Sequence, residues 1–189
     1  MTIAAPQSVA TMRARLRDIV EAYSLEHGIF TLASGATSNF YFNLKKTTLD
    51  PEASLLIADL ILDALAENPP AFIGGLEMGA VPIAACVGMR SVQVGTIVRP
   101  FYVRKVAKDH GVRRRIDINL TPGARAVILE DTTTTGASAL QAAEAVRAAG
   151  CVADTVVTLV DRLEGAEQSL NAAGLQLLSL FTIADFGLT

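Results

Sequence analysis

The sequence predicts an α/β fold in which a mainly parallel sheet is flanked by helices. Short apolar runs typical of buried strands alternate with segments of helical periodicity, which is the pattern of strand–helix–strand units. Two of the apolar runs, 72–73 and 126–129, lead through glycines or acids directly into a helical segment. About half (51%) of the 189 residues are hydrophobic, which is enough for one substantial core, so we expect a single domain over 1–189.

The N-terminal segment predicts one helix and two short strands. Hydrophobic residues recur at helical spacing with arginines and acids between them, which indicates an amphipathic helix that ends near Gly28. These hydrophobic positions are Val9, Met12, Leu16, Ile19, Val20 and Tyr23. Residues 29–32 and 40–44 are strand-like runs on either side of a polar turn at 34–39.

A second helix and a strand–loop–helix unit follow. Asp50 is a typical N-cap with proline at the first helical position, and this helix is expected to end near Ala66. Residues 72–73 then enter a glycine-rich loop at 74–79, and the next helix is predicted at 81–89.

The middle of the chain predicts extended structure around a charged stretch. Residues 92–98 are expected to form a strand, and 101–104 continue extended. A polar stretch covers 105–115, after which 116–120 are extended again.

The C-terminal third predicts a strand, a helix and a last strand. A β-branched run at 152–160 ends at Asp161 and Arg162. A short helix at 164–173 and a strand at 175–183 close the chain, which completes the alternation of strands and helices.

The most informative segment joins the apolar strand at 126–129 to a helix at 139–149. The strand ends on two carboxylates, Glu130 and Asp131, and four threonines, a glycine and a serine follow. The chemistry therefore sits where a strand ends and a helix begins, which is where ligands bind in open α/β sheets.

This turn has the chemistry of a site for a sugar monophosphate. Backbone N–H groups of 132–137, the hydroxyls and the positive end of the following helix can hold one anion. The paired carboxylates suit the vicinal hydroxyls of a sugar, where each charge-assisted hydrogen bond is worth roughly 1.5–3 kcal/mol. The segment lacks the lysine of a nucleotide-binding P-loop. The alternative is that the two acids only cap the helix.

The apolar strand, the two acids and the sequence Thr-Thr-Gly-x-Ser resemble the motif with which type I phosphoribosyltransferases bind 5-phosphoribosyl 1-pyrophosphate (PRPP). The whole chain resembles the orotate phosphoribosyltransferases among them. The resemblance implies that Glu130 and Asp131 hold the ribose hydroxyls and that Asp131 is catalytic. It also implies that Gly75, Gly79 and the segment between them lie near the pyrophosphate, for which a close-packed turn is the alternative. The residues it assigns to the 5-phosphate are Thr132, Thr133, Thr134, Thr135, Gly136, Ala137 and Ser138.

The stretch 104–115 holds six of the sixteen basic residues of the chain. A solvated charged loop or a nucleic-acid patch are the alternatives, but the segment resembles the catalytic loop of the family. The resemblance implies that Arg104, Lys105, Lys108 and His110 contact PRPP, and that the last three of these are catalytic. It also implies that Lys105 reaches across a dimer interface.

Orotate recognition is expected from two parts of the chain. In the family, a Ser-Gly-x-x-Ser turn followed by aromatic residues forms a hood over the base, and 34–42 match that pattern. The resemblance assigns Arg162 and Thr134 to orotate. The chain departs from the family at four positions, where positive charge or a proline is common: Ala33, Ala36, Asn39 and Met78.

The resemblance implies a single phosphoribosyltransferase domain with a hood over about 1–48, a core over about 49–165, and a C-terminal remainder that completes both. The reaction implied is transfer of the phosphoribosyl group from PRPP to orotate. Mg²⁺ is the expected cofactor, held mainly through PRPP rather than by protein ligands, and a homodimer with shared active sites is the expected assembly. A different base, or a PRPP-sensing regulator without catalysis, are the alternatives.

Composition sets the expected surroundings of the protein. The formal net charge of −3 gives no indication of nucleic acid or membrane as a partner. The sequence shows neither a signal peptide nor an apolar run of about 18 residues, and its two cysteines lie in apolar surroundings. We therefore expect a cytoplasmic protein.

Overall fold

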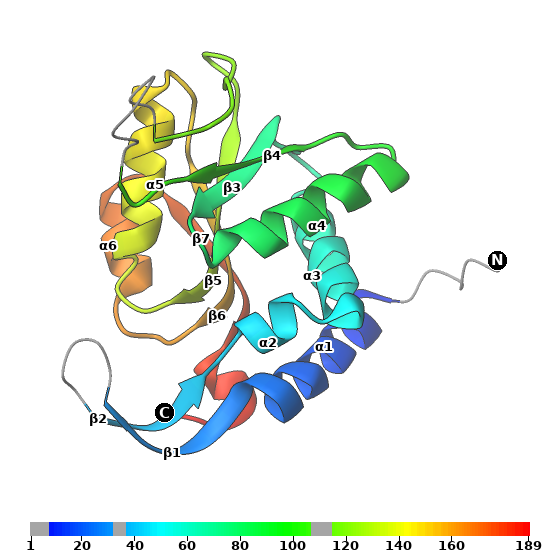
Figure 1. Ribbon diagram of the computed structural model, residues 1–189, viewed down its shortest axis with the longest axis vertical. Coiled ribbons are helices and arrows are strands. Elements are labelled where there is room, and N and C mark those ends of the chain that lie inside the picture. The colour runs from blue at the N-terminus through cyan, green and yellow to red at the C-terminus, as the bar shows by residue number, and fades with distance from the viewer. Residues whose placement is uncertain (1–7, 32–36, 107–114) are drawn as a thin grey trace.

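The computed structural model describes residues 8–31, 37–106 and 115–189 (Figure 1). Within these residues, a central sheet of five strands has the order β4-β3-β5-β6-β7, and every neighbouring pair is parallel. The strands are β3 (Phe72–Leu76), β4 (Arg99–Val103), β5 (Ala126–Thr133), β6 (Thr155–Asp161) and β7 (Gln176–Thr182). The predicted fold class is confirmed.

Helices cover both faces of this sheet (Figure 1). α3 (Pro51–Ala64) and α4 (Ala80–Gln93) pack on one face. α5 (Ala137–Ala148) and α6 (Ala166–Ala172) pack on the other. The start of α3 is as predicted, because the Asp50 carboxylate accepts a hydrogen bond from the Ala53 amide at 2.9 Å.

The central strand β5 supplies side chains to both hydrophobic clusters. Successive side chains of a strand point to opposite faces of the sheet. Val127 and Leu129 accordingly join the cluster beneath α3 and α4, whereas Ala126 and Ile128 join the cluster beneath α5. All four are fully buried, which fixes the register of β5 and so the position of the acids at its end.

The N-terminal part forms a helix, an antiparallel hairpin and a short second helix. These elements are α1 (Val9–Ser24), β1 (Leu25–Thr31), β2 (Thr37–Phe42) and α2 (Lys45–Thr48). The hairpin lies beyond the carboxyl ends of the parallel strands (Figure 1). The buried hydroxyls of Ser24 and Thr47 are hydrogen-bonded at 2.6 Å, which joins the end of α1 to α2.

The C-terminal segment packs against the hairpin. After β7 the chain forms a short 3₁₀ helix, η1 (Ile183–Phe186). The Phe186 ring lies 5.3 Å from that of Phe42 and 5.6 Å from that of Phe181, so it contacts both the hairpin and the end of the sheet. The domain boundaries expected near 48 and 165 stay predictions.

Residues 92–98 do not form the predicted strand. The Val94 amide still donates to the Arg90 carbonyl at 3.1 Å at the end of α4, Gly95 follows with a φ of 83°, and β4 begins only at Arg99. The β-branched residues of this run favour a strand, but continued hydrogen bonding along α4 outweighs that preference. The first helix also ends earlier than predicted, at Ser24, because β1 begins at the next residue.

Gly74 and Gly75 belong to β3, not to the loop predicted at 74–79. A Cβ on Gly74 would lie 2.0 Å from the carbonyl oxygen of Phe101, and one on Gly75 would lie 2.0 Å from that of Leu129. The glycines therefore serve close packing of neighbouring strands. The stretch 116–120, predicted to be extended, joins the sheet only through an isolated bridge between Ile116 and Val103.

Within residues 8–31, 37–106 and 115–189, no helix is both long enough and apolar enough to cross a membrane.

Candidate active site

The candidate site lies at the carboxyl edge of the sheet, where the winding direction reverses. β3 pairs with β4 on one side and with β5 on the other, so the helices that follow β3 and β5 lie on opposite faces. Such a reversal opens a crevice between the two turns. The turns touch, since a Cβ on Gly79 would lie 2.5 Å from Oδ1 of Asp131. Glycine is required there to leave room for the carboxylate.

In the second half of β5, Glu130 is buried and Asp131 is half-buried. Glu130 is 7% exposed, and its Oε1 has no hydrogen-bond partner among the described residues. Burial, reinforced by the charge of Asp131, raises the pKa of Glu130 to about 8. Burial also raises the pKa of Asp131, although Oδ1 accepts a 2.8 Å hydrogen bond from the Thr132 amide. The pair is thus poised to accept donors from a ligand.

The turn after these acids forms a small cradle. Gly136 adopts a φ of 82° directly before α5, a conformation that favours glycine. A cavity of about 60 Å³ is lined by Glu130 and by residues 132–139. The Thr133 hydroxyl at this turn is buried without a hydrogen-bond partner among the described residues. All seven residues assigned to the 5-phosphate line this cavity, and their role in binding stays a prediction.

A larger cavity of about 500 Å³ adjoins the cradle and shares Glu130, Thr132 and Ser138 with it. Asp131 of the same strand also lines it, and the remaining lining residues come from three other segments: Lys45, Leu76, Glu77, Met78, Gly79 and Lys105. The cavity places Lys105 beside the two acids of the same chain, and the charge of Lys105 acts to lower the pKa of Glu130. The expected reach of Lys105 across a dimer interface stays a prediction. A pentose carrying a second anionic group would fit a cavity of this size and charge.

Sequence reasoning missed Lys45 of this cavity, and it included Glu77 only as part of the segment between Gly75 and Gly79, without a role of its own. Oε1 of Glu77 accepts a 3.0 Å hydrogen bond from the backbone amide of Lys105, so Glu77 holds the start of the basic stretch against the site. Neither the Lys45 side chain nor the Glu77 side chain forms a recognisable binding motif with its immediate neighbours in the sequence. Lys45 follows a hairpin strand and Glu77 follows β3, and only the fold brings them together.

The basic stretch is described only at its two ends. Arg104 forms an ion pair with Asp117 at 2.7 Å, and its guanidinium lies 5.5 Å from the ring centroid of Tyr102. The Tyr102 hydroxyl donates to the same carboxylate. Lys108 and His110 lie outside the described residues. Contacts of all these basic residues with PRPP stay predictions.

Arg162 lines a separate cavity of about 820 Å³ between the end of β6, the hairpin and the C-terminal segment. Its guanidinium lies 5.2 Å from the ring centroid of Phe40 and pairs with Glu164 at 2.9 Å. The Arg162 side chain is 10% exposed, and its Nε is buried without a partner in the described chain. A flat anionic ligand could satisfy that donor. Thr134 lines the cradle, and residues 33–36 lie outside the described residues.

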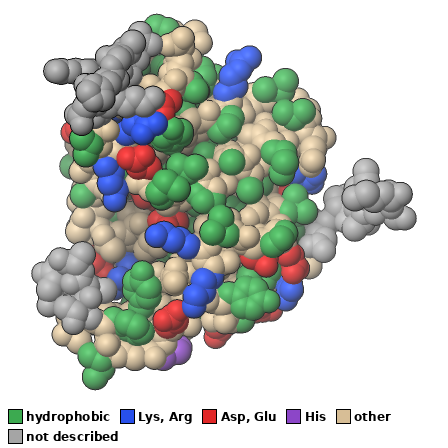
Figure 2. Space-filling view, viewed as in Figure 1, with side chains coloured by type: hydrophobic (Ala, Val, Ile, Leu, Met, Phe, Trp, Pro, Cys, Tyr) green, Lys and Arg blue, Asp and Glu red, His purple; other side chains and the backbone are tan. Residues whose placement is uncertain are grey.

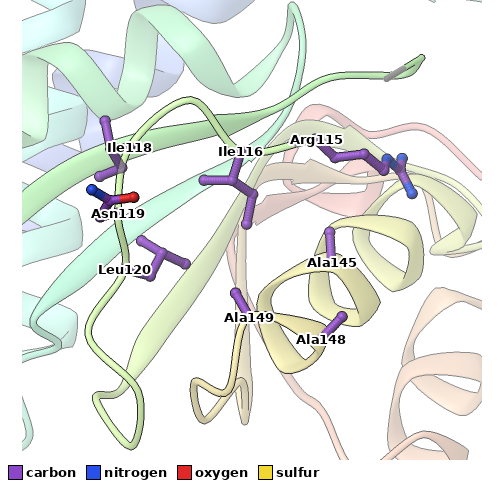
Figure 3. A pocket seen from close by; sticks show the side chains of 8 residues that line it. All are labelled: Arg115, Ile116, Ile118, Asn119, Leu120, Ala145, Ala148 and Ala149. Carbon is purple, nitrogen blue, oxygen red and sulfur yellow. The ribbon is translucent and has the colours of Figure 1, made fainter. Parts of the chain in front are cut away.

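Another cavity, of about 640 Å³, lies away from these acids, between residues 116–120 and α5 (Figure 3). Alanines of α5, including Ala145 and Ala148, face Ile116 and Leu120 across it. Arg115 is the one charged residue among the eight described residues that line it. These eight described residues offer no carboxylate or hydroxyl pair for a sugar phosphate, so we assign the site to the carboxyl edge.

A scan against models of protein families finds no match. An orotate phosphoribosyltransferase of Rhodopseudomonas palustris (strain BisB18) is 48% identical over 183 residues, which cover 95% of this chain and 98% of that protein.

Solved structures agree with the sequence comparison. Orotate phosphoribosyltransferase of Mycobacterium tuberculosis H37Rv in complex with Fe(III) dicitrate matches with a TM-score of 0.84 and 39% identity, covering 94% of this chain and 99% of that one. The complex of the same enzyme with PRPP matches with a TM-score of 0.79 and 35% identity over the same shares. With this identity over nearly its whole length, the chain belongs to the orotate phosphoribosyltransferase family.

Proposed function

We propose that this protein transfers the 5-phosphoribosyl group from PRPP to orotate, giving orotidine 5′-monophosphate and pyrophosphate. The observation that carries the proposal is the pair of the buried Glu130 and the half-buried Asp131, followed by a hydroxyl- and amide-lined cradle at the switch point of the sheet. A phosphate beside a diol is the ligand that this arrangement suits. Nearly half identity to a relative that carries this name supports the same conclusion.

The ribose would lie over the two carboxylates with its 5-phosphate in the cradle. The unpartnered Oε1 of Glu130 and the Asp131 carboxylate accept hydrogen bonds from the vicinal hydroxyls. The amides and hydroxyls of 132–138 donate to the phosphate, which sits at the positive end of α5. Both ends of the sugar are thereby held, which orients its anomeric carbon.

The bond that breaks joins the anomeric carbon to a pyrophosphate oxygen, and the bond that forms joins it to N1 of orotate. Pyrophosphate leaves with the electron pair of the broken bond, so positive charge develops on the ribose and negative charge on the leaving group. Lys105 beside Glu130 is placed to stabilise the negative charge. The orotate nitrogen is itself the nucleophile, so the chain has no need to supply one.

Mg²⁺ is the proposed cofactor, and the donor set fits it. Mg²⁺ is usually bound through one or two carboxylates together with substrate phosphates. Glu130 and Asp131 offer hard oxygen donors, while the described residues hold no group of three or more His, Cys, Asp or Glu that could cage a metal alone. PRPP would therefore supply most ligands. When bound, Mg²⁺ neutralises charge on the departing pyrophosphate.

Arg162 is the proposed recognition residue for orotate. A base that carries a carboxylate needs a cation, and the Arg162 guanidinium stands over the face of Phe40 in the cavity next to the hairpin. Its partnerless Nε is a donor that a planar carboxylate can use. A purine has no carboxylate and would leave this donor unsatisfied, which favours orotate over a purine base.

A homodimer is part of the proposal, with a second copy of this chain as the partner. It rests on the family resemblance and on apolar side chains gathered over α4 and the turn after it (Figure 2). The side chains there include Met89, Val92 and Ile97, which are 64%, 63% and 67% exposed. A group of exposed apolar side chains is typical of a surface that contacts another protein. The proposed compartment is the cytoplasm, which agrees with free thiols at Cys86 and Cys151.

The test mixes the pure protein with PRPP, Mg²⁺ and orotate and follows the loss of orotate absorbance. We expect turnover that requires Mg²⁺ and falls roughly 100-fold in Lys105→Ala, the size seen when one donor to a developing negative charge is removed. Lys46→Ala is the matched control, because Lys46 forms an ion pair with Glu26 at 2.7 Å. Pyrophosphate release with a purine but not with orotate would contradict the proposal. Binding of PRPP without turnover on any base would favour a regulator.

A further inference from the structure

We infer that Lys45 is an additional substrate-binding residue, and that its ammonium group binds the pyrophosphate of PRPP. The inference rests on the proposed function and deepens it. Lys45 lies in α2, far in sequence from the acid pair and the basic stretch, yet it lines the same cavity as Glu130, Asp131 and Lys105.

The position of Lys45 is set by the core. The preceding residue, Leu44, is 2% exposed, and Thr47 and Thr48 are buried on the inner side of α2. The hydrogen bond between Thr47 and Ser24 ties α2 to the end of α1. Because α2 is firmly packed, Lys45 presents its charge to the cavity and no loop has to become ordered first. This reduces the entropic cost of binding.

The other charged side chains that line the cavity explain why the ammonium group of Lys45 is needed there. Glu77, Glu130 and Asp131 bring carboxylates, against which the described residues set only Lys45 and Lys105. PRPP is itself a polyanion, so its binding depends on cations that offset these carboxyl groups. The charge of Lys45 already reaches the acid pair, because it acts to lower the pKa of Asp131.

The cavity also indicates which anionic group Lys45 meets. The cradle for the 5-phosphate is lined by Glu130 and residues 132–139, and Lys45 is not among these. Lys45 instead shares the larger cavity with Gly79, Lys105 and Met78. Met78, 62% exposed, brings no charge to the turn after β3. Lys45 therefore supplies the second cation on the pyrophosphate side of the acid pair.

The next residue provides a matched control. Lys46 is exposed like Lys45 and belongs to the same short helix, but it forms an ion pair with Glu26 of the hairpin. Within the described chain, Lys45 has no ion pair. A general effect of surface charge or of α2 stability would affect both variants, whereas direct binding of pyrophosphate would affect Lys45 alone.

The experiment compares Lys45→Ala, Lys45→Arg and Lys46→Ala with the unaltered protein in steady-state assays with PRPP, Mg²⁺ and orotate. We expect the KM for PRPP to rise about tenfold in Lys45→Ala, the effect of losing one charge-assisted contact at an exposed position. The KM for orotate and the melting temperature should stay unchanged. Lys45→Arg should restore most of the PRPP affinity, and Lys46→Ala should behave like the unaltered protein.

Product inhibition by pyrophosphate identifies the group that is bound. The inhibition constant of pyrophosphate should rise in Lys45→Ala in parallel with the KM for PRPP. An unchanged KM, an unchanged inhibition constant, or an equal effect of Lys46→Ala would overturn the inference. Loss of turnover in the unaltered protein would instead contradict the proposed function. In that case, calorimetric binding of PRPP to the same variants still tests Lys45 separately.

Discussion

The two halves of the candidate site are built in different ways. The phosphate half is one continuous segment, in which Glu130 and Asp131 lie near the end of β5 and the chain after Thr133 turns into α5. The base half is assembled from three separate stretches, which are the hairpin strand around Phe40, the end of β6 at Arg162, and the C-terminal segment. The first depends on a local turn, and the second depends on how distant elements pack.

Both halves hold buried polar atoms without partners, but of opposite kinds. Oε1 of Glu130 is an unpartnered acceptor on the phosphate half, and Nε of Arg162 is an unpartnered donor on the base half. An unsatisfied buried polar atom costs free energy that a ligand can recover. The phosphate half therefore lacks a hydrogen-bond donor, whereas the base half lacks an acceptor. Variants in the two halves should accordingly change the affinity for PRPP and the affinity for orotate separately.

The largest effect is expected from Asp131→Asn. The amide keeps the shape of the side chain but loses the charge that a ribose hydroxyl meets, which is worth roughly 1.5–3 kcal/mol. The value of kcat/KM for PRPP should therefore fall roughly 10- to 150-fold, measured at saturating orotate. The KM for orotate should change little. A larger loss of orotate affinity than of PRPP affinity would break the division between the halves.

A somewhat smaller effect is expected from Arg162→Ala, on the opposite substrate. The KM for orotate should rise about 10- to 30-fold, because a charge-assisted contact is lost at a position that retains some solvent. The KM for PRPP should stay within a factor of two or so.

Two variants control for the stacking of Arg162 on Phe40. Arg162→Lys keeps the charge but not the planar fork, so it should recover only part of the affinity. Arg15→Ala removes an arginine that pairs with Glu52 at 2.7 Å away from both cavities, and should leave kinetics unaltered. An equal rise of both KM values in Arg162→Ala would argue against a specific base site.

The smallest effect is expected from pH, acting through Glu130 on the phosphate half. Between pH 7 and 9, ionisation of a group with a pKa of about 8 goes from roughly one tenth to nine tenths complete. The ionised carboxylate is the better acceptor, so the affinity for PRPP at saturating Mg²⁺ should rise several-fold over this range. Calorimetry at pH 7, 8 and 9 measures it. Glu130→Gln should flatten the profile, and an equally steep profile in this variant would contradict the assignment.

Stability should respond to the same group with the opposite sign. The folded-state pKa of about 8 lies above the ordinary value of 4.5. Below pH 4.5 both states hold the proton, and between 4.5 and 8 the unfolded chain releases it while the folded chain keeps it. The free energy of unfolding should thus fall by on the order of a few kcal/mol as pH rises through this window. Urea titrations with and without Glu130→Gln isolate this contribution.

Prediction from sequence succeeded where the physics is local. Alternating hydrophobic periodicity gave the parallel sheet, and Asp50 marked the start of α3 correctly. It failed at 92–98, where hydrogen bonding at the end of α4 outweighs the strand preference of β-branched residues. It also failed at Gly74 and Gly75, because their packing against neighbouring strands does not show in the local sequence. For the site, it marked Arg162 and the segment that contains Glu77 only through resemblance, and it did not find Lys45.

By itself the sequence determined the order of strands and helices, and the acids followed by hydroxyls and glycine at the end of β5. These follow from side-chain periodicity and backbone preferences that act over a few residues. Three features came only from the tertiary structure: burial that raises the pKa of Glu130, the stacking of Arg162 over Phe40, and the meeting of Lys45 and Glu77 with Lys105 in one cavity. Burial and charge pairing depend on distances between segments that are remote in sequence, and only folding sets those distances.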